Sequence, residues 1–316
     1  MQLKYLFPLV VLFFISCGDS TENAAPTDSV VTDSVVNESF LMRTGQNVSY
    51  TEFDDGHYQT GAERTYSKTN SSVSVTGKDL IWQDDSSVST QSFQRDEAYN
   101  YCLSLTLDGQ DDWRLPTLQE MFTLTDFSKS TPALDDVFVN SSSGYFWSST
   151  ICPVCASSSF AVAETTGIYS RLDNSNLFRA RCVRGETLLE GDFVRNDAEN
   201  VVSDNTRKLM WQDANIVDVT DRKTFVSAID YCENLDFAGY QNWRLPNISE
   251  LRSLLNFNSV STSLDKTFVE SNDIFFSSTT DAANENNAWT VNYFQAFTPT
   301  RSKTDLTYAR CVRNII

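Results

Sequence analysis

The sequence is poor in the residue types on which many enzymes and metal proteins depend. It contains one histidine, His57, and four methionines in 316 residues. A Ser-His-Asp triad would have to use His57, and a zinc site would have no second imidazole available. We therefore expect no histidine-based catalytic site, and the chain is predicted not to be an enzyme.

Basic residues are also scarce. The chain has 24 Lys and Arg against 42 Asp and Glu, which gives a formal net charge of −18. Removal of residues 1–16 takes away only Lys4, so 23 basic and 42 acidic residues leave a charge of −19. This balance argues against nucleic acid and against sulfated glycans held by bulk electrostatics. It is compatible with divalent cations, although acidic surfaces more commonly keep exported proteins soluble.

The one long hydrophobic run lies in the opening "MQLKYLFPLVVLFFISCGDS". Lys4 supplies a positive start, and the apolar stretch from Leu6 to Ile15 is too short to span a bilayer as a helix. "FIS" followed by Cys17 resembles a bacterial lipobox. Residues 1–16 are therefore predicted to be a signal peptide, and Cys17 the site of lipidation. An ordinary secretory signal with an incidental cysteine is the alternative.

Residues 17–45 are rich in Ser, Thr, Asp, Asn and Ala and sustain neither a helical nor a strand period. Such a composition is typical of a flexible tether. We expect it to hold the folded part away from the membrane, to which only the lipid attaches the chain. The predicted location is the bacterial cell envelope, at the outer membrane or the cell surface.

The rest of the chain is an internal repeat with an offset of 129 or 130 residues. The matching pairs are LIWQDD and LMWQDA, EAYNYCLSL and SAIDYCENL, WRLPTLQE and WRLPNISE, ALDDVF and SLDKTF, FWSST and FFSST, and RARCVRG and YARCVRN. Six collinear matches in the same order predict two homologous domains. We place them at residues 46–186 and 187–316, and two copies are too few for a solenoid.

The repeat also sorts the cysteines. Cys102 and Cys182 are 80 residues apart, and Cys232 and Cys311 occupy the matching places at a separation of 79. An even number of cysteines in an exported protein favours disulfides, so we predict the pairs Cys102–Cys182 and Cys232–Cys311. The sequence "CPVC", with Cys152 and Cys155, has no counterpart and predicts a local disulfide rather than a redox pair or a metal site.

Each repeat reads as two helices followed by a small antiparallel sheet, an α+β module in which the disulfide joins the first helix to the last strand. Thr117 with Glu120 forms the pattern of a capping box, and Asn247 with Glu250 repeats it. The shared motif residues are assigned a structural role, because duplication retains those that start a helix: Trp113, Arg114, Pro116, Glu120, Trp243, Arg244, Pro246 and Glu250.

Two of these residue types have functional alternatives. An arginine at position 114 or 244 is suited to binding a ligand carboxylate with two hydrogen bonds, but a carboxylate of its own domain is the more common partner. Tryptophans stack on sugars, but tryptophans matched between copies are more typical of a core. For both types we favour the structural interpretation.

Acidic loops in the first repeat suggest a calcium site. Candidate ligands are Asp84, Asp85, Asp111 and Asp112, since calcium prefers oxygen ligands in loops. The second repeat keeps few of them, and no EF-hand spacing is present. No cofactor is required by the pattern; calcium is the only ion considered, and solvated acidic loops are the default.

Together these motifs resemble the Lcl C-terminal-like family, bacterial exported domains named after the tail of a collagen-like adhesin. The resemblance runs from Gly45 to Arg313 and includes "TGQNVSYTEFDDGHYQTGAERTYS". It implies a C-type-lectin-like fold and a role in surface binding or adhesion. "WRLPT" followed by Glu is also similar to the formylglycine-generating superfamily. This chain lacks a collagen-like Gly-x-y stalk and is strongly acidic, two departures from the named adhesin.

The function that we expect is that of a lipid-anchored binding or adhesion protein without catalysis, with a surface glycan as one expected ligand. The alternative is a structural or accessory envelope lipoprotein that binds an envelope or extracellular protein. A weaker alternative is an enzyme related to the formylglycine-generating superfamily. Fold resemblance alone does not separate these functions.

Overall fold

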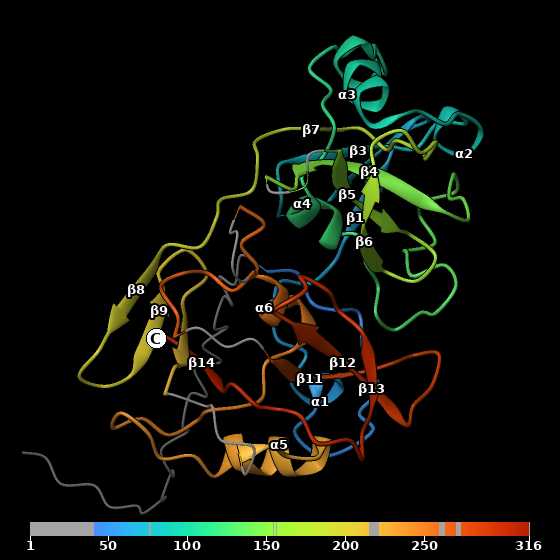
Figure 1. The fold of residues 1–316 in the computed structure, drawn as a ribbon. Coiled ribbons are helices and arrows are strands. Elements are labelled where there is room, and N and C mark those ends of the chain that lie inside the picture. The colour runs from blue at the N-terminus through green and yellow to red at the C-terminus, as the bar shows by residue number, and fades with distance from the viewer. Residues whose placement is uncertain are drawn as a thin grey trace, which may run out of the picture. The chain divides into compact units, whose positions relative to one another are not determined.

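The computed structural model describes residues 41–75, 77–153, 155, 157–214, 221–258, 263–269 and 273–315 (Figure 1). The predicted signal peptide, Cys17 and most of the tether lie outside these residues. The described residues belong to one compact unit. Within the described ranges, no helix combines the length and the apolar character that crossing a bilayer requires.

The first half of this unit contains two antiparallel sheets, with strand orders β1-β2-β3-β7 and β4-β5-β6. Three helices lie between β3 and β4 in the chain. The bounds are β1 (Tyr66–Lys68), β2 (Ser72–Val75), β3 (Leu80–Gln83), α2 (Ser87–Thr90), α3 (Arg95–Ser104), α4 (Leu118–Phe122), β4 (Tyr145–Ile151), β5 (Ser158–Ala163), β6 (Ile168–Asp173) and β7 (Val183–Arg184).

The second half repeats this plan, with strand orders β8-β9-β10-β14 and β11-β12-β13. Its described helices, α5 and α6, correspond to α3 and α4. The bounds are β8 (Phe193–Asn196), β9 (Val201–Asp204), β10 (Leu209–Gln212), α5 (Phe225–Glu233), α6 (Ile248–Arg252), β11 (Ile274–Thr280), β12 (Asn287–Asn292), β13 (Thr300–Ser302) and β14 (Val312–Asn314).

The α+β class is confirmed, but each half contains one sheet more than the sequence analysis expected. The additional sheet is built on a hairpin in which Trp82 pairs with Val73, and on the last strand of the half, where Val183 pairs with Trp82. Val73 and Trp82 are fully buried. The hairpin was missed because its strands have only four residues each, too few for an alternating pattern to stand out.

The disulfide prediction is confirmed at all three pairs. Cys102 in α3 is bonded to Cys182, which directly precedes β7, and Cys232 in α5 is bonded to Cys311, which directly precedes β14. Cys152 is bonded to Cys155 in the connection between β4 and β5. Each long-range disulfide therefore fixes the first long helix of its half to the strand that completes the additional sheet.

The matched tryptophans belong to the core, as predicted. Their exposed fractions are 0 to 2%, which leaves no ring face available for stacking on a sugar: Trp82, Trp113, Trp147, Trp211 and Trp243. The indole of Trp147 donates a hydrogen bond to the carbonyl of Phe93, and that of Trp243 to the carbonyl of Tyr240. These side chains fill the interior of each half and do not form a ligand platform.

The three disulfides predict different losses of stability. Breaking the 80-residue link with Cys102→Ala and Cys182→Ala lowers the free energy of unfolding by about 4 kcal/mol on the loop-entropy relation. Breaking Cys152–Cys155 lowers it by about 2 kcal/mol, because the loop that it closes is much shorter. Guanidinium unfolding of both double variants measures the difference, and equal losses would contradict it.

Candidate functional site

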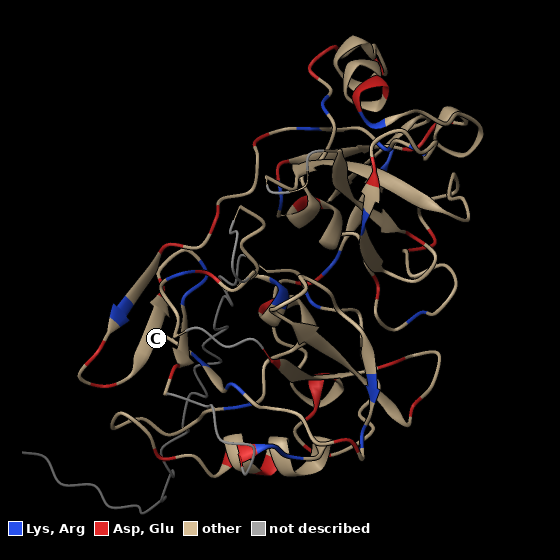
Figure 2. Ribbon diagram, in the orientation of Figure 1, with Lys and Arg blue, Asp and Glu red and all other residues tan. Residues whose placement is uncertain are grey.

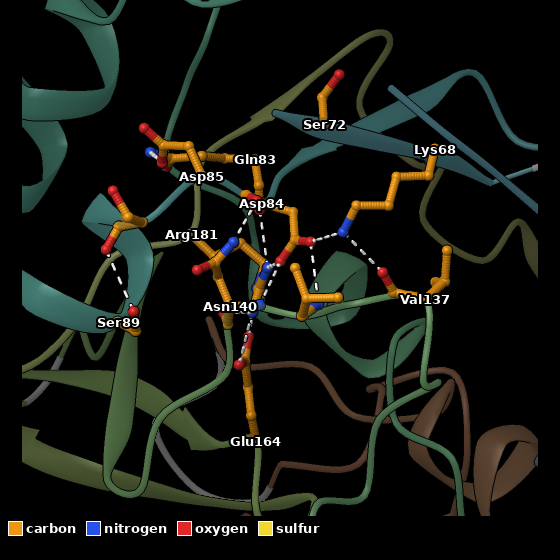
Figure 3. A network of polar contacts seen from close by, with 12 residues as sticks. Lys68, Ser72, Gln83, Asp84, Asp85, Ser89, Val137, Asn140, Glu164 and Arg181 are labelled. Carbon is orange, nitrogen blue, oxygen red and sulfur yellow. Dashed lines mark hydrogen bonds and ion pairs between the residues drawn. The ribbon is translucent and has the colours of Figure 1, made fainter. Parts of the chain in front are cut away.

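The most extensive buried polar cluster surrounds Asp84, the residue after β3 (Figure 3). Its carboxylate is paired with the guanidinium of Arg181 and the ammonium of Lys68, and it accepts the backbone N–H groups of Val139 and Asn140. Arg181 also pairs with Glu164 at 2.6 Å, between Nε and Oε1. Burial works against the charge of Arg181, but Glu164 and Asp84 together raise its pKa.

The second half contains a corresponding cluster, in which Arg195 takes the place of Lys68 and the partner of the central arginine also differs. Asp213 is paired with Arg310 and with Arg195, and it accepts the backbone N–H of Val269. At the position of Glu164 the repeat has Tyr293. Burial consequently lowers the pKa of Arg310 to about 10. Both clusters consist of carboxylates that are already neutralised by cations of the same half, so their role is to join strands and loops.

The four acids proposed as calcium ligands are not brought together. Asp84 is occupied by Arg181 and Lys68, whereas Asp85 accepts hydrogen bonds from Gln83 and Ser87. Asp112 pairs with Arg184, which lowers the pKa of this exposed carboxyl, and Asp111 is exposed. In the described part of the chain, no three Asp, Glu, His or Cys side chains are grouped to hold a metal ion. The four acids therefore do not form one shared site in the described residues, and calcium binding by this protein stays a prediction.

The arginines of the repeated motif are not free to bind a ligand. Arg114 forms two hydrogen bonds with Glu120, each of 2.7 Å, and Arg244 does the same with Glu250 at 2.7 and 2.6 Å. Each glutamate also accepts the backbone N–H of the helix N-cap residue, which completes the predicted capping boxes. The structural interpretation of the motif is confirmed.

A groove next to this motif differs between the two halves. It is formed by the helix N-cap and by the end of the strand that contains the repeated Ser-Ser-Thr sequence. In the second half the groove residues are almost completely buried, at 0 to 2% exposure: Asn247, Ser278, Thr279 and Thr280. The chain segment that buries them comes from before the first repeat.

This covering segment runs from Thr44 to Thr60 and includes α1 (Asp55–Tyr58). The side-chain amide of Gln46 makes two reciprocal hydrogen bonds of 3.0 Å with the backbone of Thr280. Asn247 donates to the hydroxyl of Thr60 at 3.0 Å. Residues 46–60, which the sequence analysis placed in the first domain, therefore lie against the second.

Asp55 is the buried centre of this contact. Its Oδ2 accepts hydrogen bonds from Thr44 at 2.6 Å and from Thr279 at 2.7 Å. The residue is 2% exposed, and burial raises the pKa of its carboxyl to about 7, although the two threonine hydroxyls oppose the rise. The next residue, Gly56, has to be a glycine, because a Cβ at that position would lie 2.0 Å from the carbonyl oxygen of Val48.

In the first half the corresponding groove is open. Thr117, Ser149 and Thr150 are only partly buried, and the side chain of Ile151 is 51% exposed. These four residues line a cavity of about 320 Å³, a size within the range of small ligand sites. Its other walls come from the segment 187–191 and from residues of the second half, among them Leu254 and Asn256.

This site was not predicted from the sequence. The segment "TGQNVSYTEFDDGHYQTG" contributes to the family resemblance, but the second repeat has no preceding copy of it. That asymmetry was the available signal: two equivalent grooves exist for one covering segment. His57 lies in the segment, exposed at the end of α1.

Asp55 predicts a pH dependence of stability. Its pKa is raised from 3.8 to about 7, so the folded chain keeps a proton that the unfolded chain releases. Stability is fully present below about pH 4 and is lost as pH rises through about 7, by on the order of 4 kcal/mol. Glu233, which accepts from Tyr58 and whose pKa burial also raises, acts in the same direction.

Asp55→Asn removes most of this dependence, because a neutral amide replaces the protonated carboxyl. We expect the variant to exceed the unsubstituted protein in unfolding free energy at pH 8 and to match it near pH 4. Urea unfolding across this range measures the effect, with the exposed Asp305→Asn as the matched control. An unchanged pH profile for Asp55→Asn would contradict the assignment.

The chain was also compared with known proteins. No curated protein matches it. The model of the Lcl C-terminal domain matches residues 71–184 and, a second time, residues 200–313. The two matched ranges end at β7 and β14, and neither includes the covering segment 44–60. Because the two tandem matches account for more than half of the sequence, the chain belongs to the Lcl C-terminal domain family.

Proposed function

We propose that this protein is an exported lipoprotein, anchored by Cys17 in the bacterial envelope, whose two domains form a non-catalytic binding or adhesion surface. The observation that carries the proposal is the contrast between the two grooves. One holds a segment of the chain through specific hydrogen bonds, and the equivalent one is an open cavity of about 320 Å³. Because the groove of the second domain binds a polypeptide segment, the equivalent open groove of the first domain is suited to binding a partner.

Several features support a binding role over catalysis. Each of the six cysteines at positions 102 to 311 is in a disulfide, whereas an enzyme of the formylglycine-generating type needs reactive cysteines. The acids of the buried clusters are paired with arginine or lysine. Acidic and basic residues are spread over helices, strands and loops of both halves (Figure 2), which gives little support to a partner recognised by bulk charge.

A C-type-lectin-like fold is part of the same proposal. It is supported by the disulfide from the first long helix to the residue before the last strand, and by the corresponding helix pairs α3 with α4 and α5 with α6, each accompanied by two small antiparallel sheets. Lectin-like architecture does not by itself imply a glycan ligand. Since the matched tryptophans are buried, a protein partner is better supported than a sugar stacked on them.

Substitution of the open groove tests the binding role. Ile151→Lys places a charge at the cavity, and we expect it to weaken binding of the partner at least tenfold. Leu177→Lys is the matched control, because Leu177 is also an exposed apolar side chain of the first half, at 63%, and does not line the cavity. Surface plasmon resonance against glycan arrays and purified envelope proteins, with and without calcium, compares the two variants. Equal binding by both would contradict the groove as the binding site.

The lipid anchor has a separate test. When the full-length protein is expressed in a bacterial host with labelled palmitate, we expect label in the protein and its recovery in the membrane fraction. Cys17→Ser should abolish both the label and the membrane association, since no other lipid attachment is proposed. Membrane recovery of the unlabelled Cys17→Ser protein would show that a different anchor operates.

A further inference from the structure

We propose that the open groove of the first domain binds an aspartate-bearing turn of a partner polypeptide, in the way that the second domain holds Asp55. This inference rests on the proposed binding function and names the chemical class of its partner. It is carried by the geometry of the two copies and by one hydroxyl group that is engaged in only one of them.

The two grooves present the same backbone and hydroxyl positions. In the second domain, the hydroxyl of Thr279 accepts the backbone N–H of Ile248 at 3.0 Å and donates to Asp55 at 2.7 Å. In the first domain, Thr150 accepts the backbone N–H of Leu118 at 2.9 Å. Among the residues that the structure describes, none accepts a hydrogen bond from Thr150.

The hydroxyl hydrogen of Thr150 is therefore available at the cavity wall, and the first hydrogen bond fixes the position of its oxygen. An acceptor that repeats the placement of the Asp55 carboxyl satisfies it. Ile151 is the equivalent of Thr280 in the first domain, and the backbone of Thr280 forms the hydrogen bonds with Gln46. A side-chain amide next to the carboxyl would complete the match, so the expected ligand is a peptide and not an isolated anion.

Differences between the grooves define how the partner departs from the chain's own segment. Ile151 replaces Thr280, and Leu103, which is 51% exposed, replaces Glu233, the acceptor for the Tyr58 hydroxyl. The first groove thus combines one hydroxyl donor with the exposed apolar side chain of Ile151, and the first domain has no side-chain acceptor at the position of Glu233. It favours an aspartate flanked by apolar residues over one flanked by tyrosine.

The cavity also limits the size and charge of the inserted part. Its volume of about 320 Å³ accommodates a short turn, not a segment as long as 44–60. Two acids, Glu190 and Asp265, line it, and Arg207 in its wall is paired with Asp204. The surroundings therefore provide no uncompensated positive charge, and the turn is held by hydrogen bonds and apolar contact.

The test uses a synthetic peptide of residues 52–57 as the probe, which contains the turn and Phe53 but not Tyr58, labelled with a fluorophore and added to the mature full-length protein. Its Asp-Asp-Gly turn carries the required carboxyl, and the chain's own copy is already engaged. We expect saturable binding in fluorescence anisotropy, with one site per chain. The peptide with Asp55→Ala should bind at least tenfold more weakly.

The matched protein variants are Thr150→Val and Thr279→Val, which remove equivalent hydroxyls in the two grooves. Thr150→Val should weaken peptide binding at least tenfold, whereas Thr279→Val should retain the site in the first domain. Circular dichroism and thermal unfolding establish that both variants are folded. Absence of saturable binding, or equal affinity for Thr150→Val and the unsubstituted protein, overturns the inference.

The outcomes also separate this inference from the proposed function. If Ile151→Lys abolishes binding of a glycan or protein ligand while the peptide fails to bind, the groove is a binding site but its ligand is not an aspartate turn. If the protein dimerises in sedimentation analysis and excess peptide dissociates the dimer, the inference holds and the partner is a second copy.

Discussion

The repeated Arg–Glu pair is the interaction on which the remaining structure depends. Arg114 and Glu120 lie six positions apart, and their paired hydrogen bonds close the turn between the tryptophan and the helix. The backbone of Arg114 exchanges hydrogen bonds with Val183 in β7, and Glu120 caps α4. One buried ion pair thus orients a helix start against the last strand of the domain. Arg244 and Glu250 repeat the arrangement.

The groove follows from that geometry. With α4 fixed, its first amide points at Thr150, and with α6 fixed the corresponding amide points at Thr279. The groove is a by-product of capping the helix, so duplication of the domain necessarily produced two. The described part of the chain contains one covering segment, and it covers the groove of the domain more distant in sequence. The two grooves therefore differ in solvent exposure, although the two domains keep the same arrangement of helices and strands.

Much of this organisation could be predicted from the sequence, because it is recorded twice. The repeat predicted the helices, the capping boxes and the two long disulfides, because equivalent residues in the two copies have the same structural role. The additional sheets were missed because strands such as Ser72–Val75 are too short to show a period. The separate placement of the four candidate acids could not be predicted, because proximity in sequence does not show which carboxylate is already neutralised: Asp84 pairs with Arg181, which is 97 residues away.

The groove itself lay beyond sequence reasoning for a related reason. Its key contact joins Asp55 to Thr279 across 224 residues, and no local pattern indicates such a pairing. The asymmetry of the covering segment was visible, but its destination was not.

Arg252 shows how one substitution between the copies adds to the asymmetry. It occupies the position in the second copy that Phe122 occupies in the first, and it is 1% exposed. Its guanidinium lies over the rings of Phe122 and Phe127 of the first copy. Burial lowers its pKa to about 10, and its guanidinium donates hydrogen bonds to the carbonyl of Gly167 and the hydroxyl of Thr298. This guanidinium joins residues of both halves without a carboxylate. Because Ser253, Leu254 and Leu255 follow it directly and line the open cavity, the arginine that connects the domains also positions one wall of the groove.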